Sequence, residues 1–293
     1  MDLVTSVAEM KAYSRRAQSD GKKLALVPTM GALHEGHLSL VRRAKRECDG
    51  VVVSVFVNPA QFGHGEDLAR YPRDLAGDLV TLRPLSVEVL FSPSVADMYP
   101  PGFETFVEPG KTAASLEGTR RPDHFRGVAT VVLKLFSIVR PEVAYFGQKD
   151  FQQTLVVRRL IEDLNLDVRL VVCPVVREPS GLARSSRNAY LSTADREVAL
   201  VLHRSLERAD GLFEAGETNA GKILDEMRGV LAAQPRAQLD YVALVEPTHC
   251  APVERVTPGC VALVAARVGS IRLIDNAVLG SAALGGASKQ GIT

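Results

Sequence analysis

Residues 23–57 contain the pattern that decides the fold, and they read KLALVPTMGALHEGHLSLVRRAKRECDGVVVSVFV. The apolar run Lys23–Val27 predicts a buried strand that stops at Pro28. Apolar residues at helical spacing then predict a helix over Gly36–Glu47. The β-branched run Val51–Val57 is too short for a helix and predicts a second buried strand. Two buried strands joined by a helix indicate a parallel pair within an α/β sheet.

The same alternation continues toward residue 175. Further buried strands are predicted over Val87–Phe91, Val143–Phe146 and Val168–Val172. Helical patterns occur between them, over Glu66–Leu82, His124–Val139 and Phe151–Leu164. Apolar strands that alternate with helices predict a Rossmann-like, doubly wound parallel sheet covered on both faces, so the fold class is α/β.

The character of the chain changes after Asn188. Two amphipathic helices are predicted, over Thr193–Ala215 and Thr218–Ala233. Three strands that look antiparallel follow, over Tyr241–Val245, Cys260–Val268 and Ile271–Ile274. We therefore predict two domains, residues 1–175 and a smaller C-terminal α+β domain over residues 176–293. The tail after Leu279 is rich in Gly, Ala and Ser and is predicted to be mobile.

The composition excludes several classes of protein. Of the 293 residues 46% are hydrophobic, and 35 Lys and Arg balance 34 Asp and Glu to a net charge of +1. That balance argues against a basic surface for nucleic acid. The longest apolar stretches are far shorter than the roughly 20 residues of a membrane helix, and residues 1–30 lack the apolar core of a signal peptide. Four cysteines without a C-x-x-C pair fit a cytoplasmic protein. From the charge and the short apolar stretches, we expect no nucleic-acid partner and no membrane partner.

The first candidate site is His34-Glu35-Gly36-His37, between the first strand and its helix. A polar loop with two incidental histidines is one interpretation. Zinc-binding helices of the H-E-x-x-H type place histidines four apart, whereas these are three apart. A helix N-terminus after a parallel strand suits phosphate, and two imidazoles can donate hydrogen bonds to its oxygens. Gly31 and Gly36 allow close backbone approach, so the context favours a phosphate site.

Two further blocks suit phosphate. In Gly147–Gln153, Lys149 offers an ammonium group and Asp150 can cap the next helix, at the end of a predicted parallel strand. In Ser185–Asn188, two hydroxyls and a guanidinium make a phosphate clamp, or alternatively the cap region of the helix that follows.

Two other blocks have features of ligand-binding sequences. In Val57–Phe62, an amide and a ring suit a small hydroxy acid, although a plain turn explains the same residues. Gly110-Lys111-Thr112 looks like the end of a P-loop, but Thr105 stands where that motif needs glycine, so the P-loop is rejected.

These blocks together carry a family resemblance. Pro28–His37 resembles the H-x-G-H nucleotide-binding motif of the nucleotidyltransferase superfamily. With Val57–Phe62 one strand later, the chain is similar to the pantoate–β-alanine ligase family, from about residue 24 to residue 277. The other matching blocks are Tyr71–Arg73, Phe146–Gln153, Ser185–Asn188 and Arg272–Asn276. The sequence departs from the family pattern at Gly77, Gln148 and Arg184.

The resemblance implies a site for each substrate. It gives catalytic roles to His34, His37, Lys149 and Arg187. It assigns to ATP the residues Met30, Gly31, Ala32, Leu33, His34, Glu35, Gly36, His37, Gly147, Gln148, Lys149, Asp150, Val176, Arg184, Ser185, Ser186 and Arg187. Pantoate would contact Met30, Gln61, Phe62 and Gln153, and Gln61 would also bind β-alanine. Asp78 matches a position associated with magnesium.

The resemblance also implies a reaction. ATP would drive the condensation of pantoate with β-alanine to pantothenate, for coenzyme A biosynthesis, through a pantoyl adenylate, with release of pyrophosphate and AMP. A homodimer is implied, in which the C-terminal domain of each chain acts as a lid. Two alternatives stay open: another nucleotidyltransferase, such as a cytidylyltransferase, that keeps the nucleotidyl conjugate as product, and a nucleotide-sensing protein without catalysis.

Overall fold

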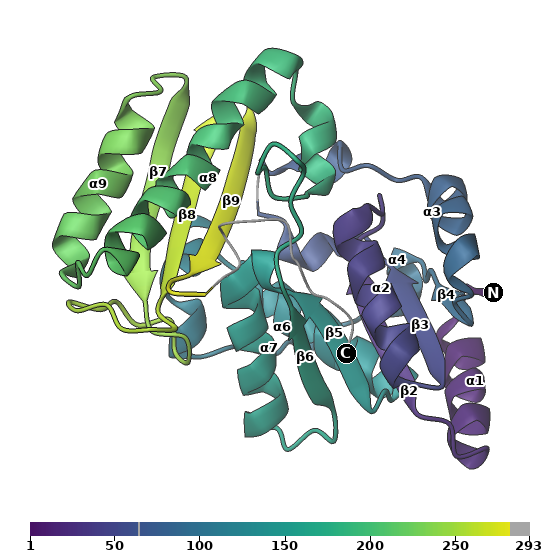
Figure 1. The fold of residues 1–293 in the computed structure, drawn as a ribbon. Helices are drawn as coiled ribbons and strands as arrows, with labels where there is room; N and C mark the ends of the chain where they lie inside the picture. Colours follow the sequence, from purple (N-terminus) through teal and green to yellow (C-terminus); the bar gives the residue numbers. More distant parts are fainter. Residues whose placement is uncertain (64, 282–293) are drawn as a thin grey trace. The chain divides into compact units, whose positions relative to one another are not determined.

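A computed structural model describes residues 1–63 and 65–281 of the chain (Figure 1). The described residues form two compact units, Met1–Pro174 and a second one that begins at Val175. Nearly all of the tail predicted to be mobile lies outside the described residues. Within residues 1–63 and 65–281, no helix combines the length and the apolar character needed to cross a bilayer.

The first unit is built on a six-stranded sheet in which every pairing is parallel. Its strands are β1 (Asp2–Val4), β2 (Leu24–Thr29), β3 (Gly50–Val55), β4 (Val89–Phe91), β5 (Val143–Gly147) and β6 (Arg169–Cys173), in the order β1-β4-β3-β2-β5-β6. The chain runs from β2 through β3 and β4 on one side, then returns to β5 and β6 on the other. The strand order reverses between β2 and β5, which is where doubly wound sheets bind ligands.

Helices cover both faces of this sheet. α1 (Val7–Ser19), α6 (His124–Val139) and α7 (Phe151–Asp163) pack on one face, with strand residues such as Leu26 and Val52. α2 (Glu35–Glu47) and α3 (Leu75–Leu82) pack on the other, with Ala25 and Val51. Neighbouring strand residues therefore point into opposite cores, which is why the strands are apolar throughout. Two helices of four residues, α4 (Val95–Met98) and α5 (Glu117–Arg120), lie in the connections.

The second unit is a two-layer α+β structure. Its antiparallel sheet has the order β7 (Ala237–Val245), β8 (Val261–Val268), β9 (Ile271–Val278). Figure 1 shows α8 (Thr193–Glu214) and α9 (Ala220–Ala232) side by side against these strands. Residues of both helices and of the sheet share one apolar core, which includes Leu206, Met227 and Val264. The predicted fold class is confirmed in both units.

Two local predictions were wrong. The helix predicted over Glu66–Leu82 is α-helical only over Leu75–Leu82, because Pro72 interrupts the pattern and the Asp74 side chain caps the helix by accepting from Gly77 N–H at 2.9 Å. The first strand does not stop at Pro28 but continues to Thr29, paired with β3. On its other side, the pairing with β5 ends at Leu26, before the proline that lacks an N–H to donate.

Candidate functional site

The carboxyl ends of three neighbouring strands carry the predicted site residues of the first unit. β2 leads into the loop Met30–His37, and β3, its neighbour, leads to Gln61 and Phe62. β5, the neighbour on the other side, leads to Gly147–Asp150. Gln153 follows in the first turn of α7. The topology therefore gathers these blocks at one edge of the sheet, at the point where the strand order reverses.

The loop after β2 is shaped by a buried carboxylate. The Asp78 oxygens accept from the N–H of Ala32 at 3.1 Å and of Leu33 at 2.7 Å. Gly31 has a φ of +83°, and a Cβ there would come within 2.9 Å of an Asp78 oxygen and of a Val55 methyl. Only 3% of Asp78 is exposed, and burial raises the pKa of its carboxyl although the two N–H bonds act against this. Asp78 thus determines the course of this loop.

The magnesium role that the resemblance implies for Asp78 stays a prediction. Each of its oxygens accepts one hydrogen bond from a backbone N–H group and keeps a further lone pair. Across residues 1–63 and 65–281, no group of three or more His, Cys, Asp or Glu side chains is arranged to hold a metal ion. Magnesium often reaches such sites bound mainly to the substrate's phosphates and to water.

The two histidines form a stacked pair at the start of α2. His34 is the N-cap, and its Nδ1 accepts from Gly36 N–H at 3.1 Å. The N–H of His34 donates to Nδ1 of His37 at 3.3 Å, and the ring centroids are 4.1 Å apart. Because each Nδ1 accepts a hydrogen bond, the proton of each neutral ring must be on Nε2. The pair therefore presents two Nε2–H donors.

Several backbone N–H groups of this loop already have acceptors inside the protein. Gly31 N–H donates to Thr29 Oγ1 at 3.1 Å, while those of Ala32 and Leu33 donate to Asp78. The N–H groups of His34 and Gly36 donate to the imidazoles. The Nε2–H groups of His34 and His37 are therefore candidate phosphate donors of this loop.

The electrostatics of the site keep His37 neutral. Burial, with smaller contributions from His34 and from the ammonium of Lys149, lowers the pKa of its imidazole to about 3. His37 is therefore a hydrogen-bond donor through Nε2 near pH 7, not an imidazolium. The influence of Lys149 also places this ammonium within electrostatic reach of the histidine pair.

Lys149 lies in a single 3₁₀ turn, Gln148–Asp150, between β5 and α7. Asp150 occupies the N-cap position of α7, but the predicted capping bond is wrong because its side chain makes none. Its carboxylate instead lies 3.5 Å from the Lys149 ammonium. Glu35 is exposed and forms an ion pair with Arg42.

The side-chain amide of Gln61 has a fixed orientation. Its Oε1 accepts from Asn58 Nδ2 at 3.0 Å. Asn58 cannot be reversed, because its Nδ2 also donates to the Gly127 carbonyl at 3.1 Å and its Oδ1 accepts from Ala60 N–H at 3.3 Å. The hydroxyl of Tyr99 donates to the same Oδ1 at 2.7 Å. Gln61 therefore directs its NH₂ group away from Asn58, toward the Met30 sulfur 3.1 Å away.

The backbone of Gln61 is held by a second network. Its carbonyl accepts from His124 Nδ1 at 2.9 Å, and the Arg121 guanidinium lies 3.1 Å from His124 Nε2. A carbonyl only accepts and a guanidinium only donates, so His124 must be neutral with its proton on Nδ1. Burial, together with the charge of Arg121, lowers the pKa of His124 to about 4. Arg121 is itself paired with Glu66 at 2.6 Å.

His124 makes stability depend on pH. Its pKa is about 4 in the folded protein and near 6.5 when unfolded, so the unfolded chain binds the proton first as pH falls. The free energy of unfolding should therefore drop by roughly 2 kcal/mol between about pH 7 and pH 5 on account of this residue. Urea unfolding of His124→Asn should show a weaker pH dependence than the wild type. The exposed His249→Asn control should keep the wild-type dependence, and equal dependence in all three proteins would contradict the assignment.

The remaining predicted residues lie in the second unit. Arg184 N–H donates to the Val176 carbonyl at 2.9 Å, so these two lie side by side. Ser185 Oγ accepts from Arg187 N–H at 3.3 Å and caps the 3₁₀ helix Ser186–Tyr190. Their contact with ATP stays a prediction.

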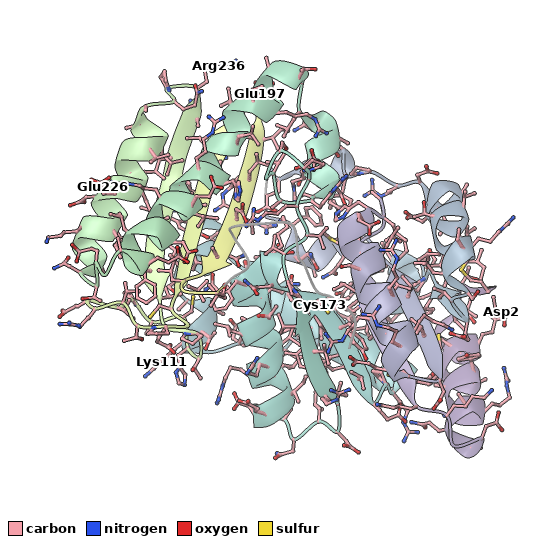
Figure 2. All side chains as sticks on the ribbon, in the orientation of Figure 1. Asp2, Lys111, Cys173, Glu197, Glu226 and Arg236 are labelled. Carbon is pink, nitrogen blue, oxygen red and sulfur yellow. The ribbon has the colours of Figure 1, made fainter. Side chains whose placement is uncertain are left out.

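Sequence reasoning missed the residues that orient the site. Tyr99, Arg121 and His124 were not predicted to support Gln61, and the hydrogen bonds of Asp78 to the loop were not predicted either. Each acts on a residue distant in the chain, so no local pattern marks it. The rejected P-loop lysine, Lys111, points outward at the surface (Figure 2).

A doubly wound parallel sheet that carries a pair of histidines at the reversal of its strand order has the architecture of a ligand-binding α/β protein. The family model described as pantoate-beta-alanine ligase matches residues 2–278. Pantothenate synthetase of Roseiflexus castenholzii is 54% identical over 279 residues, which are 95% of this chain and 99% of that protein. Its counterpart in Thermotoga petrophila is 52% identical over 96% of this chain and 100% of its own length.

Solved structures agree with these matches. The pantothenate synthetase of Thermus thermophilus superposes with a TM-score of 0.91, at 47% identity, over 95% of this chain and 99% of that one. A pantoate-beta-alanine ligase of Francisella tularensis, solved with beta-gamma ATP and beta-alanine, gives a TM-score of 0.79 at 36% identity, over 95% and 97% of the two chains. The chain belongs to the pantoate–β-alanine ligase family, and it is a pantothenate-forming ligase.

Proposed function

We propose that this ligase activates pantoate as an adenylate. A carboxylate oxygen of pantoate attacks the α-phosphorus of ATP, and the bond to pyrophosphate breaks. The amine of β-alanine then attacks the acyl carbon of pantoyl adenylate, loses a proton, and expels AMP to leave pantothenate. Adenylation is needed because a carboxylate oxygen is by itself a very poor leaving group. Neither step requires a nucleophile from the protein.

The observation that carries this proposal is the donor set of the site. The Nε2–H groups of His34 and His37 and the ammonium of Lys149 are suited to the charge that develops on phosphate oxygens during the first step. A neutral His37 stabilises this charge by hydrogen bonding, and its low pKa argues against a role as a general acid. Arg187, Ser185 and Ser186 are proposed to contact the phosphates as well.

The Francisella relative supports the choice of substrates, since it was solved with an ATP compound and β-alanine. We extend both ligands to this chain as co-substrates, together with pantoate. Magnesium is proposed to enter bound to the phosphates of ATP, with Asp78 as the proposed protein residue near it.

An isotope experiment tests the adenylate. Pantoate labelled with heavy oxygen in its carboxylate should pass one labelled oxygen to AMP in each turnover, because the C–O bond breaks in the second step. ADP as the product, or AMP without label, would overturn the adenylate. ATP and pantoate without β-alanine should release pyrophosphate but little free AMP. A stable nucleotidyl product would favour a cytidylyltransferase-like enzyme, and ATP binding without turnover would favour a sensor.

Gln61 is proposed to bind pantoate through its NH₂ group. Gln61→Ala should raise the KM for pantoate about 10- to 100-fold, the effect expected for a hydrogen bond to a charged group. Gln61→Glu is the sharper test, because the same shape then presents a negative oxygen in place of a donor. It should be worse than Gln61→Ala in steady-state assays. A Gln61→Glu enzyme better than Gln61→Ala would contradict the amide orientation.

Five further expectations accompany this proposal. Gln153, Met30 and Phe62 are proposed to contact pantoate, and Gln61 also β-alanine. The protein is proposed to be a homodimer, to be cytoplasmic, and to use its C-terminal domain as a lid over the reaction. Gel filtration with light scattering tests the dimer directly.

A further inference from the structure

A short β-hairpin in the second unit precedes the residues proposed to contact phosphate. It covers residues 176–184, and Arg177 and Ala183 pair across it as an antiparallel bridge. Glu178 N–H donates to the Leu182 carbonyl at 2.8 Å, and Arg184 N–H closes the base on Val176 at 2.9 Å. Ser185, Ser186 and Arg187 follow directly, so the placement of the 176–184 hairpin determines where they begin.

A buried ion pair fastens the 176–184 hairpin to β9. The Arg177 guanidinium donates to both oxygens of Asp275, at 2.6 and 3.0 Å. It also donates to the carbonyls of Gly181 at 3.1 Å and Asn276 at 3.2 Å. Only 15% of the Arg177 side chain and 4% of the Asp275 side chain are exposed. One guanidinium thus joins the first strand of the hairpin, its turn and the sheet.

Contacts with α8 hold the hairpin from a second direction. Arg196 donates to the two oxygens of Glu178 at 3.2 and 3.1 Å. At the turn, Gly181 has a φ of +97°, and a Cβ there would collide with the His203 ring. The turn is therefore packed against α8 as closely as a glycine allows.

The residues on both sides of the segment Ser185–Arg187 are held by hydrogen bonds. Its first neighbour, Arg184, is paired with the base of the hairpin. Its last neighbour, Asn188, is only 4% exposed and donates from Nδ2 to the Ala183 carbonyl at 3.0 Å. The Asn188 carbonyl in turn accepts from Arg196 at 2.8 Å. So short a span between fixed ends has few conformations.

We propose that Arg177 and Asp275 are positioning residues for ATP, because their ion pair sets the hairpin and hence the placement of Arg187. This inference rests on the proposed function, since it needs Arg187 to contact the nucleotide. A buried ion pair adds little net stability, because desolvation offsets the attraction between the charges. Its bidentate geometry does fix an orientation. The resemblance assigned no role to the block Arg272–Asn276. This block contains Asp275, so its proposed role is to position the 176–184 hairpin.

The test is a kinetic comparison of two ion pairs, each of which has one member on β9. Asp275→Asn should lower kcat/KM for ATP about 10- to 100-fold, the effect of a small misplacement of a binding group. The KM for β-alanine should stay within about twofold. The matched control is Asp240→Asn, because Asp240 pairs with Arg272 of β9 at 2.8 Å and lies outside the hairpin. This control should keep the wild-type kcat/KM for ATP.

A double-mutant cycle separates positioning from loss of structure. In an Arg187→Ala background, Asp275→Asn should cause less than about a threefold further decrease, because the residue that it positions is already gone. If Asp275→Asn fails to fold, Arg177→Lys replaces it, since lysine keeps the charge but loses the fork. Arg177→Lys should show the same selective effect on ATP.

Three results would overturn the inference: an unchanged kcat/KM for ATP in both Asp275→Asn and Arg177→Lys, an equal loss in Asp240→Asn, or a full additional loss in the Arg187→Ala background. A wild-type enzyme that forms no AMP from ATP and pantoate would instead overturn the proposed function. The two failures are therefore distinguishable.

Discussion

Replacing His37 by alanine is expected to lower pantoate-dependent ATP–pyrophosphate exchange about 10²- to 10³-fold, the usual effect of removing one preorganised donor. The Nε2–H of His37 is held in place by the bond from His34 N–H to its Nδ1 and by stacking on the His34 ring. Such a donor needs no reorganisation when charge develops on the phosphate. The loss should therefore appear in kcat of the exchange reaction more than in the KM for pantoate.

Two further variants sharpen this prediction. His37→Gln places an amide NH₂ near the position of Nε2 and should recover part of the rate. The exposed His249→Ala should keep the wild-type rate. Wild-type exchange in His37→Ala would refute the role of His37. If His37 acted as a proton donor with an ordinary pKa, His37→Ala would be slower than the wild type only below about pH 6.5, where the imidazole is protonated. The low pKa of His37 argues against that outcome.

Replacing Lys149 by methionine is expected to lower kcat/KM for ATP by a similar factor, about 10²- to 10³-fold. Methionine keeps most of the side-chain length but removes the ammonium that lies close enough to His37 to lower its pKa. The same variant should raise the pKa of His37, which proton NMR of the ring can follow. A single substitution thus gives a kinetic and a spectroscopic result.

The matched control is Lys111→Met. Lys111 belongs to the rejected P-loop sequence, is exposed, and should be dispensable. Lys149→Arg, which keeps the charge with another shape, should fall between the wild type and Lys149→Met. Equal activity in Lys149→Met and Lys111→Met would refute the assignment.

Much of the fold could be predicted because the signals are local. The helix over His124–Val139 was predicted to the residue, since an apolar pattern runs up to Arg140 and Pro141. β1 and α1 were missed. β1 has three residues, too few for a period, and α1 buries only Met10, Ser14 and Ala17. The overlong helix over Glu66–Leu82 shows the opposite error, a pattern accepted across a proline.

For the candidate site, the sequence could predict separate stretches of residues but not their arrangement. The motifs single out the histidines, Lys149 and Gln61, because each follows a recognisable strand. The residues that orient these side chains could not be predicted from the sequence. Asp78 contacts Ala32, which is 46 positions away in the chain, and His124 contacts Gln61, which is 63 positions away. Such pairings depend on how the sheet is ordered, and no local spacing encodes them.

The occupied backbone of the loop after β2 has a consequence for how the enzyme can evolve. In a glycine-rich loop that binds phosphate through backbone N–H groups, substitutions change the donors little, because every residue type except proline carries the same N–H. Here the N–H groups of Gly31, Ala32, Leu33, His34 and Gly36 are committed internally. Under the proposed function, the imidazoles of His34 and His37 contribute to recognition by this loop, and a side chain can be exchanged by a single codon change. Anion preference can then change one side chain at a time, while the internal hydrogen bonds of the backbone maintain the course of the loop.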